Sequence, residues 1–542
     1  MPHKRILFRA DARERILRGA STLADAVRVT LGPKSKCVLI EKKWAPPLVC
    51  NDGVTIVKEI ELEDPEENLG AHMLREAAER TADVVGDGTT TATLLAHAIY
   101  ADGLRNLAAG ASAIDLRRGL ERGLNVALAE IKSLAKPVAT RREKEQVATI
   151  SAHNDSVLGG FVAAAMDRVG SEGVVTVEEA KGTETAIEVV DGMQFDHGLL
   201  SPYFITDTER QLAALENPLI LLHEPRITSL KEFLPFLEAV VQARRPLVVI
   251  ADAVEAEPLA TLVVNRLRGI LDCVAVKAPG YGDRRKELMQ DIAILTGGTF
   301  FSADLGITLG GIKVADLGSA ARVVVDRDST TIIGGKGEKK AILARCDEIR
   351  LQAKAATSDY DREKLEERLA KLSGGVAIIR VGAPTEAELK SRKEALSDAI
   401  SATRAAIAEG IVPGGGFSLL KAIPAVEREE LQCDGDERTG ARILRHALEI
   451  PARTIAENSS ADGGVVVAEL RRGTGNHGFD AARGVYCDLV EAGIVDPAKV
   501  VRIALENAVS VAGTLLLTEA TLTEVKEETN GRQLHPELAA EI

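Results

Sequence analysis

A run of glycine, aspartate and threonine residues, G-D-G-T-T-T at 86–91, has the composition of an anion-binding turn. The stretches on either side, 69–85 and 92–107, have the composition of helices. The first N–H groups of a helix have no internal partner and the helix dipole is positive there, so phosphate oxygens fit well. Asp87 would repel a phosphate unless a divalent metal lay between them, and Mg²⁺ prefers carboxylate, phosphate and water oxygens. The run therefore indicates a nucleotide–Mg²⁺ site, although an ordinary helix N-cap explains the same residues equally well.

Other glycine-bearing turns follow a fixed order along the chain. They are T-L-G-P at 30–33, N-D-G-V-T at 51–55 and G-I-V-P-G-G-G at 410–416, and D-P at 496–497 opens a further segment. Each alone is more typical of a plain turn. Together, and with V-K-A-P-G-Y-G-D-R-R at 276–285, they closely resemble the group I chaperonins, the GroEL family. The resemblance extends over nearly the whole chain.

Local patterns predict the elements that must position these turns. Residues 174–177 and 185–190 read as two paired strands, and 219–222 and 247–250 as strands of an α/β module. A long helix is expected over 385–409, because Pro384 precedes it and Gly410 follows it.

The resemblance implies a multidomain α/β fold with a GroEL-like layout. The mainly helical equatorial domain would comprise 1–136 and 410–542. A small α/β intermediate domain would comprise 137–191 and 375–409, and the α/β apical domain 192–374. Glycines at both ends of that last segment would act as hinges.

Composition excludes several classes of protein. The chain has 542 residues and a formal charge of −14, whereas a nucleic-acid-binding protein needs a basic surface. No run of about 18 apolar residues occurs, so no membrane span is expected. Without an apolar segment near the N-terminus or a C-x-x-C pair, the sequence predicts a cytoplasmic protein with free thiols.

The nucleotide site cannot be of the P-loop type, because G-x-x-x-x-G-K-[ST] is absent. The resemblance instead implies ATP with Mg²⁺ on Asp87, and it leaves room for K⁺ as a further cation. The residues that the resemblance assigns to the nucleotide are Thr30, Leu31, Gly32, Pro33, Asn51, Asp87, Gly88, Thr89, Thr90, Thr91, Gly415, Asp480, Ala481, Ala482 and Asp496.

The resemblance implies that hydrolysis depends on Asp398 with help from Asp52. By helical periodicity, Asp398 lies about 200° from Leu396 and away from an apolar stripe, which favours a solvated surface residue. The resemblance implies instead that this aspartate orients the attacking water, because S-D-A at 397–399 and A-T-R-A at 402–405 match the family's catalytic helix.

Several positions depart from the family, among them Asn51, Asp480 and His197. Asn51 replaces a usual lysine and Asp480 a frequent asparagine, so both bear on nucleotide affinity. His197 stands where an arginine often pairs with an acidic residue of a neighbouring subunit, here Glu386.

Two segments of the central module, 230–241 and 259–267, carry apolar arcs of roughly 160° and 200°. Two buried core helices would explain this, as would helices that each leave one edge exposed to peptides. The resemblance favours the second interpretation and implies a polypeptide-binding groove lined by Tyr203, Phe204, Leu234, Leu237, Leu259, Val263 and Val264.

The resemblance thus implies an ATPase subunit of seven-membered rings, stacked in pairs, that binds unfolded polypeptides and a GroES-like co-chaperonin lid. A divergent paralogue with specialised partners and little refolding activity is the alternative. It is motivated by the tail at 523–542, which lacks the Gly-Met repeats common in the family.

Overall fold

The structure is a computed structural model that describes residues 4–42, 47–170, 173–180, 182–208, 210–303, 306–356 and 358–524, without the side chains at 283, 359 and 363. The tail beyond 524 lies outside the described residues. The chain divides into two compact units. Unit 1 comprises residues up to Gly159 and from Asp398 onward, and unit 2 runs from Gly160 to Ser397. The helices α7 (Ser156–Val169) and α13 (Glu386–Glu409) cross this division.

Unit 1 is mainly helical. Its helices are α1 (Arg9–Arg28), α2 (Gly53–Glu59), α3 (Pro65–Val85), α4 (Thr89–Ala108), α5 (Ala113–Leu134), α6 (Arg141–Ser151), α14 (Phe417–Gln432), α15 (Gly435–Ala447), α16 (Ile450–Asn458), α17 (Gly463–Arg472) and α18 (Ala498–Leu516). Its strands pair as β1 (Lys4–Phe8) with β19 (Ala520–Glu524), β2 (Val38–Ile40) with β3 (Leu48–Cys50), β15 (Ile411–Pro413) with β18 (Val495–Pro497), and β16 (His477–Asp480) with β17 (Val485–Asp488).

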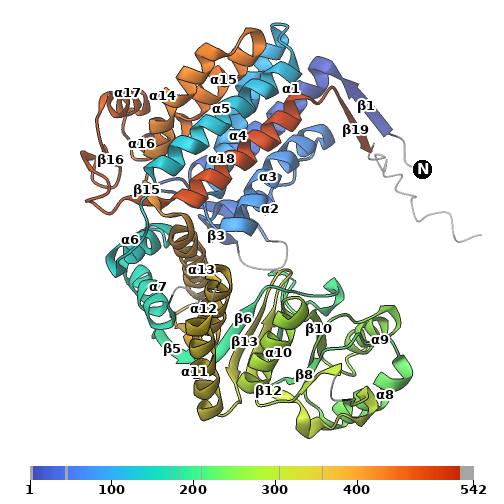
Figure 1. Cartoon of the computed structure of the whole chain (residues 1–542). Helices are drawn as coiled ribbons and strands as arrows, with labels where there is room; N and C mark the ends of the chain where they lie inside the picture. The colour runs from blue at the N-terminus through green and yellow to red at the C-terminus, as the bar shows by residue number, and fades with distance from the viewer. Residues whose placement is uncertain are drawn as a thin grey trace, which may run out of the picture. The chain divides into compact units, whose positions relative to one another are not determined.

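The core of unit 1 joins both ends of the sequence. Helix α18 packs against α3, α4 and α5, and α5 packs against α14 and α15 (Figure 1). Leu, Ile, Val and Ala side chains dominate this core, with Tyr100 and Phe417 among the few aromatic members. This packing holds the turns after α1 and α3 next to segments that follow them by about 400 residues: Asn458 bonds to Leu31 O, and Gly88 lies against Val500.

Unit 2 contains a large mixed sheet and a small one. The large sheet has the order β10 (Cys273–Lys277), β9 (Leu247–Ala251), β8 (Leu219–His223), β12 (Gly318–Val325), β13 (Thr330–Gly335) and β6 (Gly192–Phe195). Strand β11 (Phe300–Phe301) pairs with β8, and β7 (Ala213–Glu216) with β12. The helical elements are α8 (Leu230–Ala243), α9 (Ala256–Leu267), α10 (Gly282–Thr296), α11 (Lys339–Ala355), α12 (Asp359–Gly374), and the short η1 (Pro202–Phe204), η3 (Leu309–Gly311) and η4 (Val314–Asp316).

The small sheet corrects one expectation. Its order is β4 (Val174–Glu179), β14 (Val376–Val381) and β5 (Ala186–Val190). The predicted direct pairing of 174–177 with 185–190 is therefore wrong, because β14 lies between them, parallel to β4 and antiparallel to β5. A pairing predicted from neighbouring segments misses a strand that enters from about 200 residues later.

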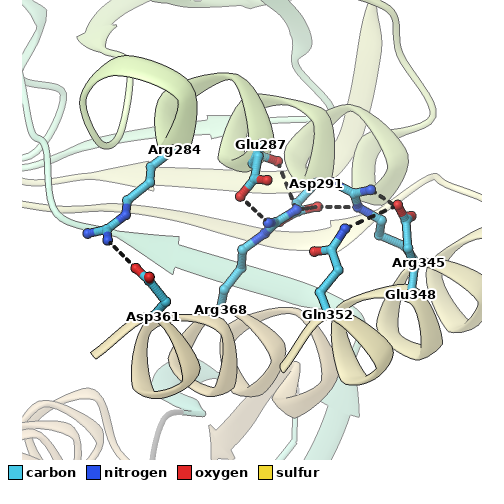
Figure 2. Close-up of polar contacts among 8 residues, drawn as sticks. All are labelled: Arg284, Glu287, Asp291, Arg345, Glu348, Gln352, Asp361 and Arg368. Carbon is cyan, nitrogen blue, oxygen red and sulfur yellow. Dashed lines mark hydrogen bonds and ion pairs between the residues drawn. The ribbon is translucent and has the colours of Figure 1, made fainter. Parts of the chain in front are cut away.

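A buried ion network fastens α11 and α12 to α10. Figure 2 shows Asp291 of α10 between Arg345 of α11 and Arg368 of α12. The Asp291 side chain is fully buried, and both guanidinium groups bond to it. Arg368 also binds Glu287 at 2.5 Å. Removal of one partner would leave a buried charge uncompensated, which is strongly destabilising. The network therefore holds α10, α11 and α12 together.

The expected multidomain α/β fold is confirmed. The long helix predicted over 385–409 is confirmed as α13, and the strands predicted at 219–222 and 247–250 as β8 and β9. The finer division into three domains with glycine hinges stays a prediction.

Candidate functional site: a carboxylate-rich cavity in unit 1

A cavity of about 280 Å³ lies within unit 1. Turns from widely separated parts of the sequence form its lining. All the residues that the resemblance assigned to the nucleotide and to hydrolysis line it, namely Thr30, Leu31, Gly32, Pro33, Asn51, Asp52, Asp87, Gly88, Thr89, Thr90, Thr91, Asp398, Gly415, Asp480, Ala481, Ala482 and Asp496.

The N-terminus of α4 supplies the anion-binding end. Gly88 is its N-cap and has a left-handed φ of 79°, where a Cβ would approach Val500 at 2.7 Å. Thr89 and Thr90 open the helix, and no side chain caps its first N–H groups. Thr30 and Thr90 share a hydrogen bond of 3.1 Å between their hydroxyls, which joins the turn after α1 to this helix start. Unpaired N–H groups and hydroxyls together suit phosphate oxygens.

Asp87 lies beside this helix start and is held from two sides. The Gly88 N–H donates to Oδ1 at 2.6 Å, and the Ser151 hydroxyl donates to Oδ2 at 2.7 Å. Burial raises the pKa of Asp87 and the charge of Asp52 adds to the rise, whereas these hydrogen bonds and His153 lower it. A carboxylate in such an environment gains from a nearby cation.

Two further carboxylates of the cavity, those of Asp480 and Asp496, are also held by backbone donors. Asp480 is buried and accepts from the N–H groups of Ala482 and Arg483, at 2.9 and 3.1 Å. Burial, and then the charge of Asp87, raise the pKa of Asp496 to about 7, although the N–H groups of Gly415 and Gly416 bond to it. Such carboxylates can accept hydrogen bonds from ribose hydroxyls or base N–H groups.

Ser418 adds an unmet polar group. Its hydroxyl is fully buried, lines the cavity and has no hydrogen-bond partner among the described residues. Buried polar groups are normally satisfied, so this one favours a polar ligand in the cavity.

Asp398 reaches the cavity from α13 and is half-buried. Leu396 and Ile400 on either side of it are buried in the protein. Helix α13 passes close to the turn after α3, where a Cβ on Gly86 would lie 2.5 Å from Cβ of Ser401. Helical periodicity alone favours a solvated surface position for Asp398, whereas in the structure this residue is half-buried and lines the cavity.

Asp52 is the N-cap of α2, and its Oδ2 accepts the Thr55 N–H at 2.7 Å. Gly53 lies against the start of α4, where a Cβ would meet the Thr90 hydroxyl at 2.4 Å. This close approach holds Asp52 in the same cavity as Asp87 and Asp398.

The end of α6 contributes residues that sequence reasoning missed. Ile150, Ser151, His153 and Asn154 line the cavity from there. No glycine-bearing turn marks this segment, and its one signal is a Ser, His, Asn and Asp cluster after a helix. The hydroxyl of Ser418 was missed as well, although Ser418 lies two residues after the glycine-bearing turn at 410–416.

The donor set fits a metal only in part. Among the described residues, no group of three or more His, Cys, Asp or Glu side chains could hold an ion. Asp87 beside an uncapped helix start would fit Mg²⁺ that takes its other ligands from a phosphate and from water, which is the usual arrangement for that ion.

The predicted polypeptide-binding residues lie in unit 2, on η1, α8 and α9. Helix α9 packs against both η1 and α8. Tyr203, Leu234 and Val264 are exposed, at 63%, 45% and 42% of their surface, and Leu259 and Val263 are half-buried. Phe204 and Leu237 are instead buried in the core of the unit, so they support this apolar surface from beneath.

No helix in the described part of the chain is long and apolar enough to cross a membrane. A model of the TCP-1/cpn60 chaperonin family matches residues 23–526. The chain is also 62% identical over 541 residues to Chaperonin GroEL 5 of Bradyrhizobium diazoefficiens, with 100% of both chains covered. The chain therefore belongs to the TCP-1/cpn60 chaperonin family, in its group I or GroEL type, whose members assist protein folding.

Proposed function

We propose that this chaperonin hydrolyses ATP in the cavity of unit 1 and uses the energy to bind and release non-native polypeptides on the apolar surface of unit 2. The observation that carries the proposal is the gathering of an uncapped helix start, threonine hydroxyls and five aspartates around one cavity.

Each part of the site has a role in this proposal. The start of α4 and the turn of Thr30 to Pro33 hold the phosphates, and Asp480 and Asp496 accept hydrogen bonds from the base and ribose. Mg²⁺ on Asp87 would neutralise phosphate charge. Asp398 orients the attacking water, with Asp52 beside it, because phosphoryl transfer depends on positioning and charge stabilisation.

The partners follow from the family and from the apolar surface. Unfolded segments expose apolar side chains, which Tyr203, Leu234 and Val264 can contact. We include in the proposal a GroES-like lid, assembly into seven-membered rings stacked in pairs, and a cytoplasmic location.

Refolding of a stringent client protein tests the proposal. Wild-type chain with ATP and a GroES-type lid should raise the yield of active client well above spontaneous refolding, and ADP should not. Client binding without ATP-dependent refolding would favour the alternative, a specialised paralogue that holds particular partners.

A further inference from the structure

The charges around the nucleotide cavity are unevenly distributed. Five carboxylates line it, from Asp52, Asp87, Asp398, Asp480 and Asp496. Among the described residues that line it there is no lysine or arginine, and Asn51 contributes a neutral amide. A polyphosphate is itself strongly negative, so this lining lacks the permanent cation that phosphate sites commonly use.

His153 is the one basic side chain among those described lining residues. It is exposed, and it lines the same cavity as Asp87, on whose carboxylate its charge acts. An imidazole carries at least one N–H donor in either protonation state. His153 can therefore donate to a phosphate oxygen whether or not it is charged.

The backbone around His153 holds it in an unusual conformation. His153 and Asn154 have left-handed φ angles of 55° and 65°. The N–H of Asn154 bonds to Thr149 O at 2.8 Å, and that of Asp155 to Ala152 O at 3.0 Å, so the turn is well fixed. Left-handed non-glycine residues are disfavoured and concentrate at functional sites. Ser151, two residues earlier, donates a hydrogen bond to Asp87. One segment would therefore position both the metal-binding carboxylate and a side chain that donates a hydrogen bond to phosphate.

We propose that His153 is a nucleotide-binding residue that donates a hydrogen bond to the terminal phosphates, so that it selects nucleoside triphosphates over nucleotides with fewer phosphates. The inference rests on the proposed nucleotide site and adds a residue to it.

The test compares His153→Gly with the wild type. Glycine has no side-chain donor and adopts the left-handed region readily, so the turn is kept. His446→Ala is the control, since His446 lies on α15 and does not line the cavity. Affinities for ATP, ADP and AMP are measured by calorimetry with Mg²⁺ present, and thermal melts compare the folds.

His153→Gly should weaken ATP binding about 10-fold or more, the usual effect of losing a hydrogen bond to a charged group. AMP affinity should stay within about twofold, and the control should match the wild type for every nucleotide. Unchanged ATP affinity would overturn the inference, as would equal losses for ATP and AMP, which indicate a structural role. A wild-type chain that binds no nucleotide would instead refute the proposed function.

Discussion

The Ser151 hydroxyl donates a 2.7 Å hydrogen bond to Oδ2 of Asp87, and so ties the end of α6 to the start of α4. The other oxygen of Asp87 accepts the Gly88 N–H. Each carboxylate oxygen thus has one fixed donor and keeps a lone pair for another partner. This arrangement orients Asp87 before any cation arrives.

Ser151→Ala should therefore loosen Asp87 and weaken the response to Mg²⁺. Removal of a group that orients a metal ligand typically costs 10- to 100-fold in metal affinity, so we expect about a 10-fold rise in the Mg²⁺ needed for half-maximal ATPase activity. Ser133→Ala is the control, because Ser133 is exposed and bonds only within α5. An unchanged Mg²⁺ titration for Ser151→Ala would show that Asp87 needs no such support.

Asp496 should make the nucleotide-free protein less stable at alkaline pH. Its folded-state pKa of about 7 lies above the ordinary value of 3.8, so the folded state holds the proton more tightly. Stability from this group is complete below the ordinary pKa and is lost as the pH rises through about 7. The whole shift corresponds to about 4 kcal/mol at most.

Asp496→Asn removes that titration while keeping an acceptor oxygen. Its melting temperature should exceed that of the wild type at pH ~8, and the difference should vanish toward pH ~4, the ordinary aspartate range. Asp434→Asn is the control, because Asp434 is exposed and its side chain caps no N–H. A difference between Asp496→Asn and the wild type that does not vary with pH would refute the assignment.

The apolar surface of unit 2 can be separated from its supporting core by a matched set of serine variants. Leu234→Ser and Val264→Ser alter exposed side chains and should weaken capture of unfolded polypeptide with little effect on the melting temperature. Leu237 is only 5% exposed, so Leu237→Ser should destabilise the unit by at least the ~2–5 kcal/mol of a core truncation. If both surface variants capture unfolded polypeptide normally, this surface is not the polypeptide-binding site.

His197 should limit cooperativity between subunits except in acid. Burial lowers the pKa of His197, and Lys277 and Arg285 lower it further against the opposing effect of Asp196. It therefore becomes charged only below the ordinary value of ~6.5, and the pair that we propose with Glu386 of a neighbouring subunit would form only there.

The Hill coefficient of ATP hydrolysis should accordingly stay low from pH ~8 to ~6.5 and rise below that pH. His197→Arg should raise it over the whole range, because arginine is always charged. Identical, pH-independent coefficients for both chains would show that His197 takes no part in subunit coupling.

Much of the candidate site could be predicted from the sequence because glycine-bearing turns leave local signatures. The turn before Thr89 needs left-handed glycines at 86 and 88, and both appear in the sequence as a visible motif. Ser151 and His153 leave no such mark, since only tertiary packing brings an ordinary serine or histidine to a cavity.

The fold shows the same limit. Helix α13 was predictable from Pro384 and Gly410, which bracket it. The insertion of β14 between β4 and β5 depends on pairing over about 200 residues, which local patterns do not encode. Likewise, the apolar arc of α8 does not predict which of its leucines are buried: Leu237 is buried in the core, whereas Leu234 is exposed to water.

Asp398→Ala tests the central claim most directly, because it separates nucleotide binding from hydrolysis. The variant should bind ATP with Mg²⁺ as tightly as the wild type, measured by calorimetry, while single-turnover hydrolysis slows by about 10²–10⁴-fold, the usual loss when a group that positions or activates water is removed. Hydrolysis at the wild-type rate would contradict the account and return Asp398 to the status of an ordinary cavity-lining residue.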